Sequence, residues 1–192
     1  MNIEEKLKKV LTQLNKIEYG WVDKYGVVHK KSRKDFFLQN YRLQSIDETL
    51  KYKVGTCWEQ VELARYLLKK ESIQCKTYII IYNDDDVIAK HTIAIVENKQ
   101  KYYLIESSWD MELRVFNSTD EIFTMFIKMY PNMYKIKDYD VKKIEIFEYG
   151  KPNEHLNYSE FTKFYKQGVK QSTWIIRLNN KIIKLNVKEG VN

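Results

Sequence analysis

The segment at residues 56–59, Thr-Cys-Trp-Glu, constrains this chain more than any other. A Thr followed three residues later by a Glu is the pattern of a capping box, in which each side chain accepts a hydrogen bond from the other residue's backbone N–H. Thr56 is then the N-cap of a helix, and Cys57 is its first residue. The stripe headed by Cys57 continues by steps of three and four, which predicts a buried helix face. Its next members are Val61, Ala64 and Leu68.

Four further helices are expected from capping and spacing patterns. Ser45 and Ser118 each begin an S-x-x-E pattern, and Pro131 is expected to stop the helix that Ser118 opens. Apolar residues at helical spacing near the N-terminus predict an amphipathic helix. The expected ranges are 3–16, 45–55, 118–130 and 159–170.

Strand-like runs occupy much of the second half of the chain, and a turn is expected at Tyr25-Gly26 in the mixed segment before it. The expected strands are 75–82, 91–96, 102–106 and 141–148, with a hairpin over 172–187 that turns at Asn179-Asn180. Helices first and strands later predict an α+β fold with a mainly antiparallel sheet. Without a repeat or a composition break, residues 1–192 are expected to form a single domain.

Cys57 has the position that a cysteine nucleophile needs. Unpaired N–H groups and the positive end of the helix dipole favour a thiolate at a helix start. The Cys57 N–H also lies where an oxyanion would form. Because buried free cysteines are common, a structural role remains the alternative.

His91 and Glu106 are expected to complete a triad. A two-residue turn at Asn98-Lys99 would place residue 91 opposite residue 106 on adjacent antiparallel strands, where Cβ atoms lie about 5 Å apart. Glu106 could then orient one ring nitrogen and leave the other for Cys57. A competing register would bring Ser108 or Asp110 to His91, and His91 taken alone fits a core histidine.

Three stretches resemble the transglutaminase-like family, within the papain-like group of thiol acyl-transfer proteins. They are the cysteine helix at 54–68, the strand at 90–96 and the strand at 101–109, and their order and spacing match the family across residues 54–110. The resemblance, closest to small bacterial and phage members, implies a nucleophile helix packed on an antiparallel sheet. It also implies a triad of Cys57, His91 and Glu106. The family mostly has Asp-Pro where this chain has Glu106-Ser107.

The resemblance implies a thiol-dependent hydrolase or acyltransferase, either a cysteine peptidase or amidase or a transglutaminase-type transferase. A peptide or protein amide is the expected substrate, and the chemistry requires neither a metal nor an organic cofactor. A second oxyanion donor is expected from Gln39, Gln44 or Trp21. The alternative is a catalytically silent binding module that retains the fold. Hydrolysis and transfer are not distinguished, and the oligomeric state is left open.

The charge and the numbers of cysteines and histidines limit which partners and metals are expected. The net charge is +7, but the lysines are spread along the chain. The basic run at 29–34 is interpreted as a solvated loop in preference to a nucleic-acid site. Two cysteines without an export signal favour reduced thiols in a cytoplasmic protein. Three histidines and no C-x-x-C argue against zinc. No apolar run is long enough to span a bilayer.

Overall fold

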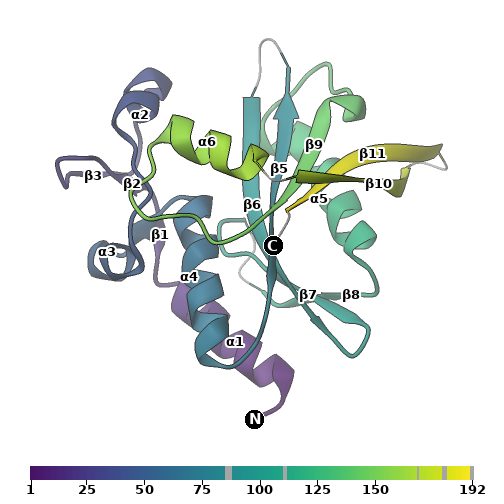
Figure 1. Ribbon diagram of the computed structural model, residues 1–192, viewed down its shortest axis with the longest axis horizontal. Coiled ribbons are helices and arrows are strands. Elements are labelled where there is room, and N and C mark those ends of the chain that lie inside the picture. Colours follow the sequence, from purple (N-terminus) through teal and green to yellow (C-terminus); the bar gives the residue numbers. More distant parts are fainter. Residues whose placement is uncertain (85–87, 110–111, 168, 179–180, 191–192) are drawn as a thin grey trace.

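A seven-stranded sheet with helices on both faces forms the centre of the protein (Figure 1). The computed structural model describes residues 1–84, 88–109, 112–167, 169–178 and 181–190. The strand order is β10-β11-β9-β5-β6-β7-β8, and the pairs are antiparallel except for β11 with β9. The α+β class with a mainly antiparallel sheet is therefore confirmed. The strand bounds are Lys76–Asn83 (β5), Ile88–Asn98 (β6), Lys101–Ile105 (β7), Arg114–Phe116 (β8), Ile144–Tyr149 (β9), Val169–Leu178 (β10) and Lys181–Gly190 (β11).

The helices begin where the sequence supplies a capping side chain. Complete capping boxes headed by Asn2, Ser45, Thr56 and Asn157 open four of them. These are α1 (Ile3–Leu14), α3 (Ile46–Tyr52), α4 (Cys57–Lys70) and α6 (Tyr158–Lys166). α5 (Thr119–Met133) is capped by the Ser118 side chain, and α2 (Lys34–Asn40) begins without a side-chain cap. The expected helices are present, although α1, α3 and α6 end earlier than the pattern predicts.

α5 continues through Pro131, so the expectation that this proline stops the helix is wrong. A proline inside a helix leaves the carbonyl four residues earlier without its N–H partner. That carbonyl belongs to Ile127, and the Tyr139 hydroxyl donates a hydrogen bond to it at 2.9 Å. α5 also buries Phe123 and Phe126 against the sheet. Packing and a replacement donor therefore compensate for the missing backbone bond.

The turn between β6 and β7 lies one residue later than expected. Lys99 and Gln100 have φ angles of 48° and 60°, and two consecutive positive φ values are the mark of a type I′ hairpin turn. Ala94 consequently pairs with Ile105, and the ladder ends there. The expected pairing of residues 91 and 106 is wrong, because neither is a rung of the β6–β7 ladder.

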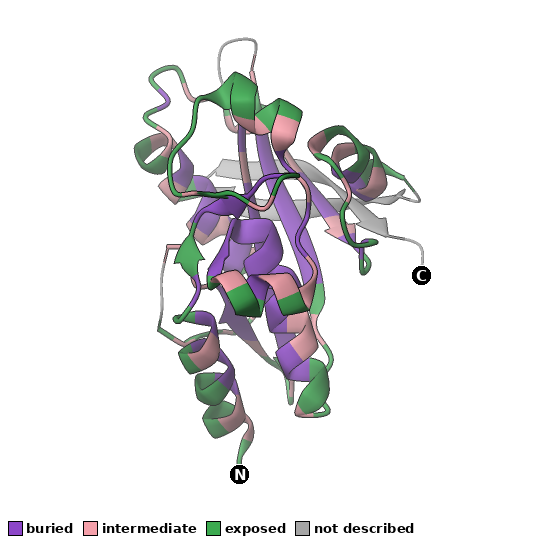
Figure 2. Cartoon of the chain, turned by 90° about the vertical axis from the view of Figure 1, so that its left-hand side faces the viewer, coloured by how far each residue is buried: buried purple, intermediate pink, exposed green. Residues whose placement is uncertain are grey.

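Alternate residues of the central strands face two separate cores. Ile79 and Ile81 of β5 pack with α1, α4 and α6, whereas Tyr78 and Ile80 pack with α5 on the opposite face. α4 is buried all round over residues 57–64, and Figure 2 shows this helix as the buried centre of its layer. Each fully buried aliphatic side chain contributes about 1.5–3 kcal/mol to the stability of this arrangement. Burial on all sides fixes the position of the α4 N-terminus.

Two short strand pairs connect the N-terminal segment to α4. β1 (Glu18–Tyr19) runs parallel to β4 (Val54–Gly55), with Tyr19 opposite Gly55. A Cβ on residue 20 would lie 2.8 Å from the His29 carbonyl oxygen, so Gly20 is required for this close approach. β2 (Trp21–Val22) and β3 (Val28–His29) flank the predicted turn, in which Gly26 has a φ of 83°.

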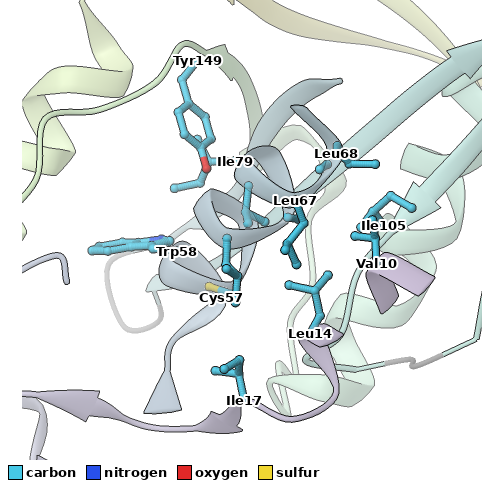
Figure 3. Packing of buried hydrophobic residues seen from close by; sticks show 14 of the residues in the cluster. Val10, Leu14, Ile17, Cys57, Trp58, Leu67, Leu68, Ile79, Ile105 and Tyr149 are labelled. Atoms are coloured by element: carbon cyan, nitrogen blue, oxygen red, sulfur yellow. The ribbon is translucent and has the colours of Figure 1, made fainter. Parts of the chain in front are cut away.

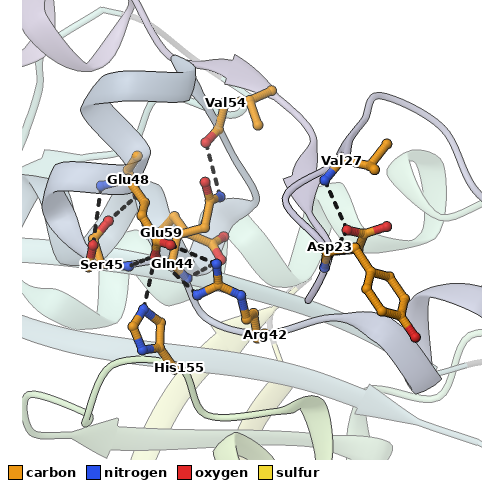
Figure 4. A network of polar contacts seen from close by, with 11 residues as sticks. Asp23, Val27, Arg42, Gln44, Ser45, Glu48, Val54, Glu59 and His155 are labelled. Carbon is orange, nitrogen blue, oxygen red and sulfur yellow. Dashed lines mark hydrogen bonds and ion pairs between the residues drawn. The ribbon is translucent and has the colours of Figure 1, made fainter.

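A polar network ties α3 to the segment before α6 (Figure 4). The Arg42 guanidinium donates hydrogen bonds to both Glu48 oxygens, at 2.6 and 3.2 Å, and His155 Nε2 lies 3.0 Å from the same carboxylate. Burial opposes the charged carboxylate, but the bonds from Arg42, the Ser45 N–H and His155 lower the pKa of Glu48 to about 2. The network holds the start of α6, which carries Tyr158, next to α4.

The remaining expectations concern the end of the chain and its environment. The strand expected at 141–148 is a short 3₁₀ turn (Val141–Lys143) followed by β9. The expected hairpin is present as β10 and β11, whereas its turn at 179–180 lies outside the described residues. Among the described residues, no helix has the length and apolar character to cross a membrane.

Candidate active site

Cys57 is the first residue of α4, as the sequence predicts. Thr56 has an extended backbone, and its hydroxyl accepts a hydrogen bond from the Trp58 N–H at 3.2 Å. The first N–H groups of a helix lack intrahelical acceptors, and together with the helix dipole they stabilise negative charge. Figure 3 shows the Cys57 sulfur at this end of the helix, in the direction of Ile17.

Glu59 fixes the start of α4 from inside the protein. Its carboxylate accepts hydrogen bonds from the Thr56 N–H at 2.8 Å and from the Thr56 hydroxyl at 2.5 Å. The Tyr41 hydroxyl donates a third at 2.6 Å. Burial raises the pKa of Glu59, although these donors oppose the rise. Thr56, the residue before Cys57, is therefore held by two hydrogen bonds to a buried carboxyl group that Tyr41 also binds.

His91 lies where β7 leaves the edge of β6 uncovered. β6 pairs with β7 only over residues 94–98, so residues 88–93 have no partner on that side in the described ladder. The His91 imidazole is buried and stacks on the Trp109 indole, with 3.8 Å between ring centroids and 12° between planes. Phe126 of α5 lies 5.5 Å away. These rings set the plane of the imidazole.

Glu106 reaches His91 from the turn that follows β7. Its Oε1 lies 3.2 Å from His91 Nε2. The Nε2–H is not aligned with either oxygen for a hydrogen bond, so the contact is an ion pair. The carboxylate also accepts hydrogen bonds from the backbone N–H groups of Ser108 at 2.6 Å and Trp109 at 2.9 Å. The two residues meet although the expected register does not bring them together.

Gln60 connects the turn that carries Glu106 to the helix that carries Cys57. Its Oε1 accepts hydrogen bonds from the hydroxyls of Ser107 at 2.9 Å and Ser108 at 2.6 Å. Sequence reasoning missed this positioning role. The available signal was a glutamine directly before the buried stripe residue Val61, because a buried amide requires hydrogen-bond partners.

The imidazole interacts with Cys57 as well as with Glu106. Burial disfavours a charged ring, but interaction with the Cys57 side chain and the Glu106 carboxylate outweighs it, and the pKa of His91 rises to about 9. The ring therefore carries a proton at neutral pH. The structure thus places Glu106 beside His91, and the Cys57 side chain acts on the same imidazole.

A cleft of roughly 500 Å³ opens beside Cys57. The Cys57 side chain is 6% exposed and contributes to its wall. Aromatic rings and lysines line most of the rest, together with Gly20, Ser32, Leu38, Thr56 and Ile88. The rings are those of Tyr19, Trp21, Phe37, Trp58, Tyr134 and Tyr158. The cleft is the route by which a substrate would reach the sulfur.

The three candidates for a second oxyanion donor lie in different places. The Gln44 amide is buried and donates to the Val54 carbonyl at 3.1 Å. Gln39 is exposed and does not line the cleft. Trp21 does line it, but its indole N–H donates to the Ser32 hydroxyl at 3.1 Å. Their geometry favours none of them as a donor to a bound substrate.

Tyr19 is a site residue that sequence reasoning missed. It lines the cleft, and β1 places it opposite Gly55, two residues before the cysteine. Tyr19 is 58% exposed, and negative charge at Cys57 is the main cause that raises the pKa of its hydroxyl. The Tyr19 hydroxyl therefore responds to the charge of the sulfur. Only pairing of β1 with β4 brings it there, and that pairing has no sequence signature.

The other cysteine and one further histidine have surroundings that suit a structural role. Burial raises the pKa of the Cys75 thiol to about 11. His29 is half-buried rather than exposed, because its Nε2 lies 2.9 Å from the buried Asp23 carboxylate. Asp110, the alternative to Glu106, lies outside the described residues. Within the described ranges, no three His, Cys, Asp or Glu side chains gather in a group that could hold a metal ion.

Comparison with known proteins does not assign the chain to a family. No protein-family model matches the chain, and no curated protein matches it significantly.

Proposed function

We propose that this protein is a thiol-dependent acyl-transfer enzyme with Cys57 as its nucleophile. The observation that carries the proposal is the convergence of three side chains from α4, β6 and the turn after β7. The His91 imidazole interacts with Cys57 and with Glu106, its Nε2 lying 3.2 Å from Glu106 Oε1. This arrangement of nucleophile, base and orienting carboxylate is the one that acyl transfer through a thiol requires.

The reaction proceeds through a thioester on Cys57. The thiolate sulfur attacks the carbonyl carbon of an amide or ester, and the carbonyl oxygen becomes an oxyanion. The bond to the leaving group breaks as the His91 imidazolium gives that group its proton. Water or an amine then attacks the thioester, loses a proton to His91, and the sulfur leaves as the thiolate. Transfer to water makes the protein a peptidase or amidase, and transfer to an amine makes it a transglutaminase-type enzyme.

Backbone and side-chain donors stabilise the oxyanion. The Cys57 N–H at the start of α4 is one donor, because it belongs to the first turn of the helix. We assign the second to the Tyr19 hydroxyl, which lines the cleft with Cys57. Glu106 keeps a proton on Nε2 and leaves Nδ1 for exchange with the sulfur.

The fold is consistent with a transglutaminase-like, papain-like domain. A helix with the cysteine at its N-terminus packs on the antiparallel sheet, and His91 and Glu106 follow in that order on or directly after neighbouring strands. This order is the one implied by the sequence resemblance over residues 54–110.

Selective alkylation tests the proposal. Iodoacetamide at about pH 7 is expected to modify Cys57 at least ~100-fold faster than Cys75, because only a thiolate reacts. Burial raises the pKa of Cys75 to about 11, which makes it an internal control. Mass spectrometry of digested protein locates the adducts over time.

His91→Ala should slow modification of Cys57 at neutral pH and leave Cys75 unchanged. His155→Ala is the matched control, since His155 pairs with Glu48 on the surface and does not line the cleft. Equal rates at the two cysteines, or a Cys57 rate that His91→Ala does not alter, would refute an activated thiolate.

One observation favours a second candidate function. Cys57 is only 6% exposed and His91 only 1%, which suits a catalytically silent binding module in which the triad is a buried polar cluster. Acyl-thiol probes separate the two. A covalent adduct on Cys57 in wild type, absent in Cys57→Ser, supports the enzyme, and failure of any acyl probe to react with an alkylatable Cys57 supports the module.

A further inference from the structure

The cleft beside Cys57 is strongly basic. Four lysines line it, and the described residues of its wall include neither Asp nor Glu. Lys30 and Lys31 follow β3 and Lys34 is the first residue of α2, whereas Lys90 comes from β6, next to His91. The lysine run therefore forms a wall of the cleft and is more than the solvated loop expected from sequence.

Lys90 directly precedes His91 in the chain, and its side chain is partly buried. Its Nζ lies 4.6 Å from the centre of the Tyr158 ring and 3.4 Å from the Thr162 hydroxyl. Burial, followed by the charges of Lys166 and Lys34, lowers the pKa of Lys90 to about 8. Within the described part of the chain, no carboxylate lies at ion-pair distance from Lys90 or Lys34.

An anion bound between these lysines would remove an unfavourable interaction. The positive charges of Lys34 and Lys90 repel each other, and such repulsion is stronger away from bulk water. Lys30, by contrast, is already paired with Glu18. Lys31, Lys34 and Lys90 remain to bind a negatively charged group that enters the cleft, and Lys34 is the one of these whose charge acts on Lys90.

Resting on the proposed function, we propose that the acyl donor is an acidic peptide, with a carboxylate side chain bound between Lys34 and Lys90 near the carbonyl that Cys57 attacks. The cations that line the described part of the cleft are all lysines, whose ammonium groups can bind a carboxylate as point charges. Its aromatic rings suit the apolar parts of a peptide. The net charge of +7 adds long-range attraction for acidic chains.

Paired alkylating agents test the anion site without a known substrate. The measured quantity is the rate of Cys57 alkylation by anionic iodoacetate divided by the rate with neutral iodoacetamide. Lys34→Gln and Lys90→Gln should each lower this ratio about five- to tenfold, because each removes a nearby positive charge. Lys8→Gln, an exposed site on α1, makes the same charge change and should leave the ratio unaltered.

An activated Cys57 whose ratio does not respond to Lys34→Gln or Lys90→Gln would overturn the acidic-substrate proposal and leave the proposed function standing. A Cys57 that is not activated at all would refute the proposed function instead. The two failures are therefore distinguishable.

Equilibrium binding tests the substrate class directly. The full chain with Cys57→Ser is titrated into a fluorescein-labelled peptide of alternating Glu and Ala, and into its Gln counterpart. The Glu peptide should bind at least about tenfold more tightly, and Lys34→Gln or Lys90→Gln should remove most of the difference. Equal binding of both peptides, or binding of neither, would overturn the proposal. Displacement of the Glu peptide by inorganic phosphate at a concentration similar to that of the peptide would also overturn it.

Discussion

Glu106 Oε1 lies 3.2 Å from His91 Nε2, although the two residues share no rung of the sheet. β7 ends at Ile105, and the turn that follows folds the Glu106 carboxylate back onto the N–H groups of Ser108 and Trp109. Trp109 from the same turn stacks on the imidazole. A single turn therefore supplies both the carboxylate that orients the histidine and the ring that fixes its plane.

Glu106→Gln is expected to lower the acylation rate about 10²–10⁴-fold, because the imidazole loses the charge that orients it and stabilises its protonated form. Thermal unfolding should shift much less than activity, since the amide can still accept the two backbone bonds of the turn. The measurement is the rate at which an acyl-thiol probe labels Cys57. Glu97→Gln, on an exposed part of β6, is the control. A variant that labels at the wild-type rate would exclude Glu106 from the triad.

The His91 proton should be retained well above neutral pH. Bonding to Cys57 and Glu106 overcomes burial and raises the pKa of His91 from 6.5 to about 9. The charged ring therefore stabilises the fold fully below about pH 6.5, and this contribution is lost as the pH rises through about 9. Labelling of Cys57 by an acyl probe should fall over the same alkaline limb, because the leaving group loses its acid. The check is a histidine NMR titration, in which a midpoint near 6.5 would contradict the ion pair.

Tyr19→Phe should slow acylation about 10²–10³-fold if its hydroxyl is an oxyanion donor. Binding of substrate in the ground state should change little, so the loss should appear in kcat rather than KM. Alkylation of Cys57 by iodoacetamide, which forms no oxyanion, should stay near the wild-type rate. Tyr25→Phe, on an exposed turn, is the matched control. Equal loss in acylation and alkylation would assign Tyr19 a structural role only.

Local patterns were sufficient to predict the position of the proposed nucleophile. The capping box at Thr56 and Glu59 specifies where α4 begins, so Cys57 is at the helix start in both the sequence and the structure. Strand runs and order likewise predicted an α+β protein. Such features depend on residues that lie close together in the chain, so the sequence alone is sufficient to predict them.

Long-range geometry was not predictable in the same way. The hairpin register depended on which two residues adopt positive φ, and Lys99-Gln100 carries no Gly or Asn to mark them. Tyr19 reaches the site through a two-residue strand, and Gln60 through contacts with a distant turn. Pro131 remained inside α5 because Tyr139, eight positions later in the chain, supplies a donor to the freed carbonyl. Each of these depends on a partner that sequence spacing does not identify.

Glu48→Gln should destabilise the protein by on the order of 1 kcal/mol at neutral pH, because the variant loses the ion pair with Arg42. Hydrogen bonds that overcome burial lower the pKa of Glu48 from 4.5 to about 2. Its charge therefore stabilises the fold above about pH 4.5, and the contribution is lost as the pH falls from 4.5 toward 2.

Urea unfolding of wild type and Glu48→Gln between about pH 7 and 3 should show the difference in unfolding free energy shrinking below pH 4.5. Glu160→Gln, which removes a capping carboxylate without an ion pair among the described residues, should show a smaller loss at neutral pH. A Glu48→Gln difference that stays constant down to pH 3 would contradict the lowered pKa.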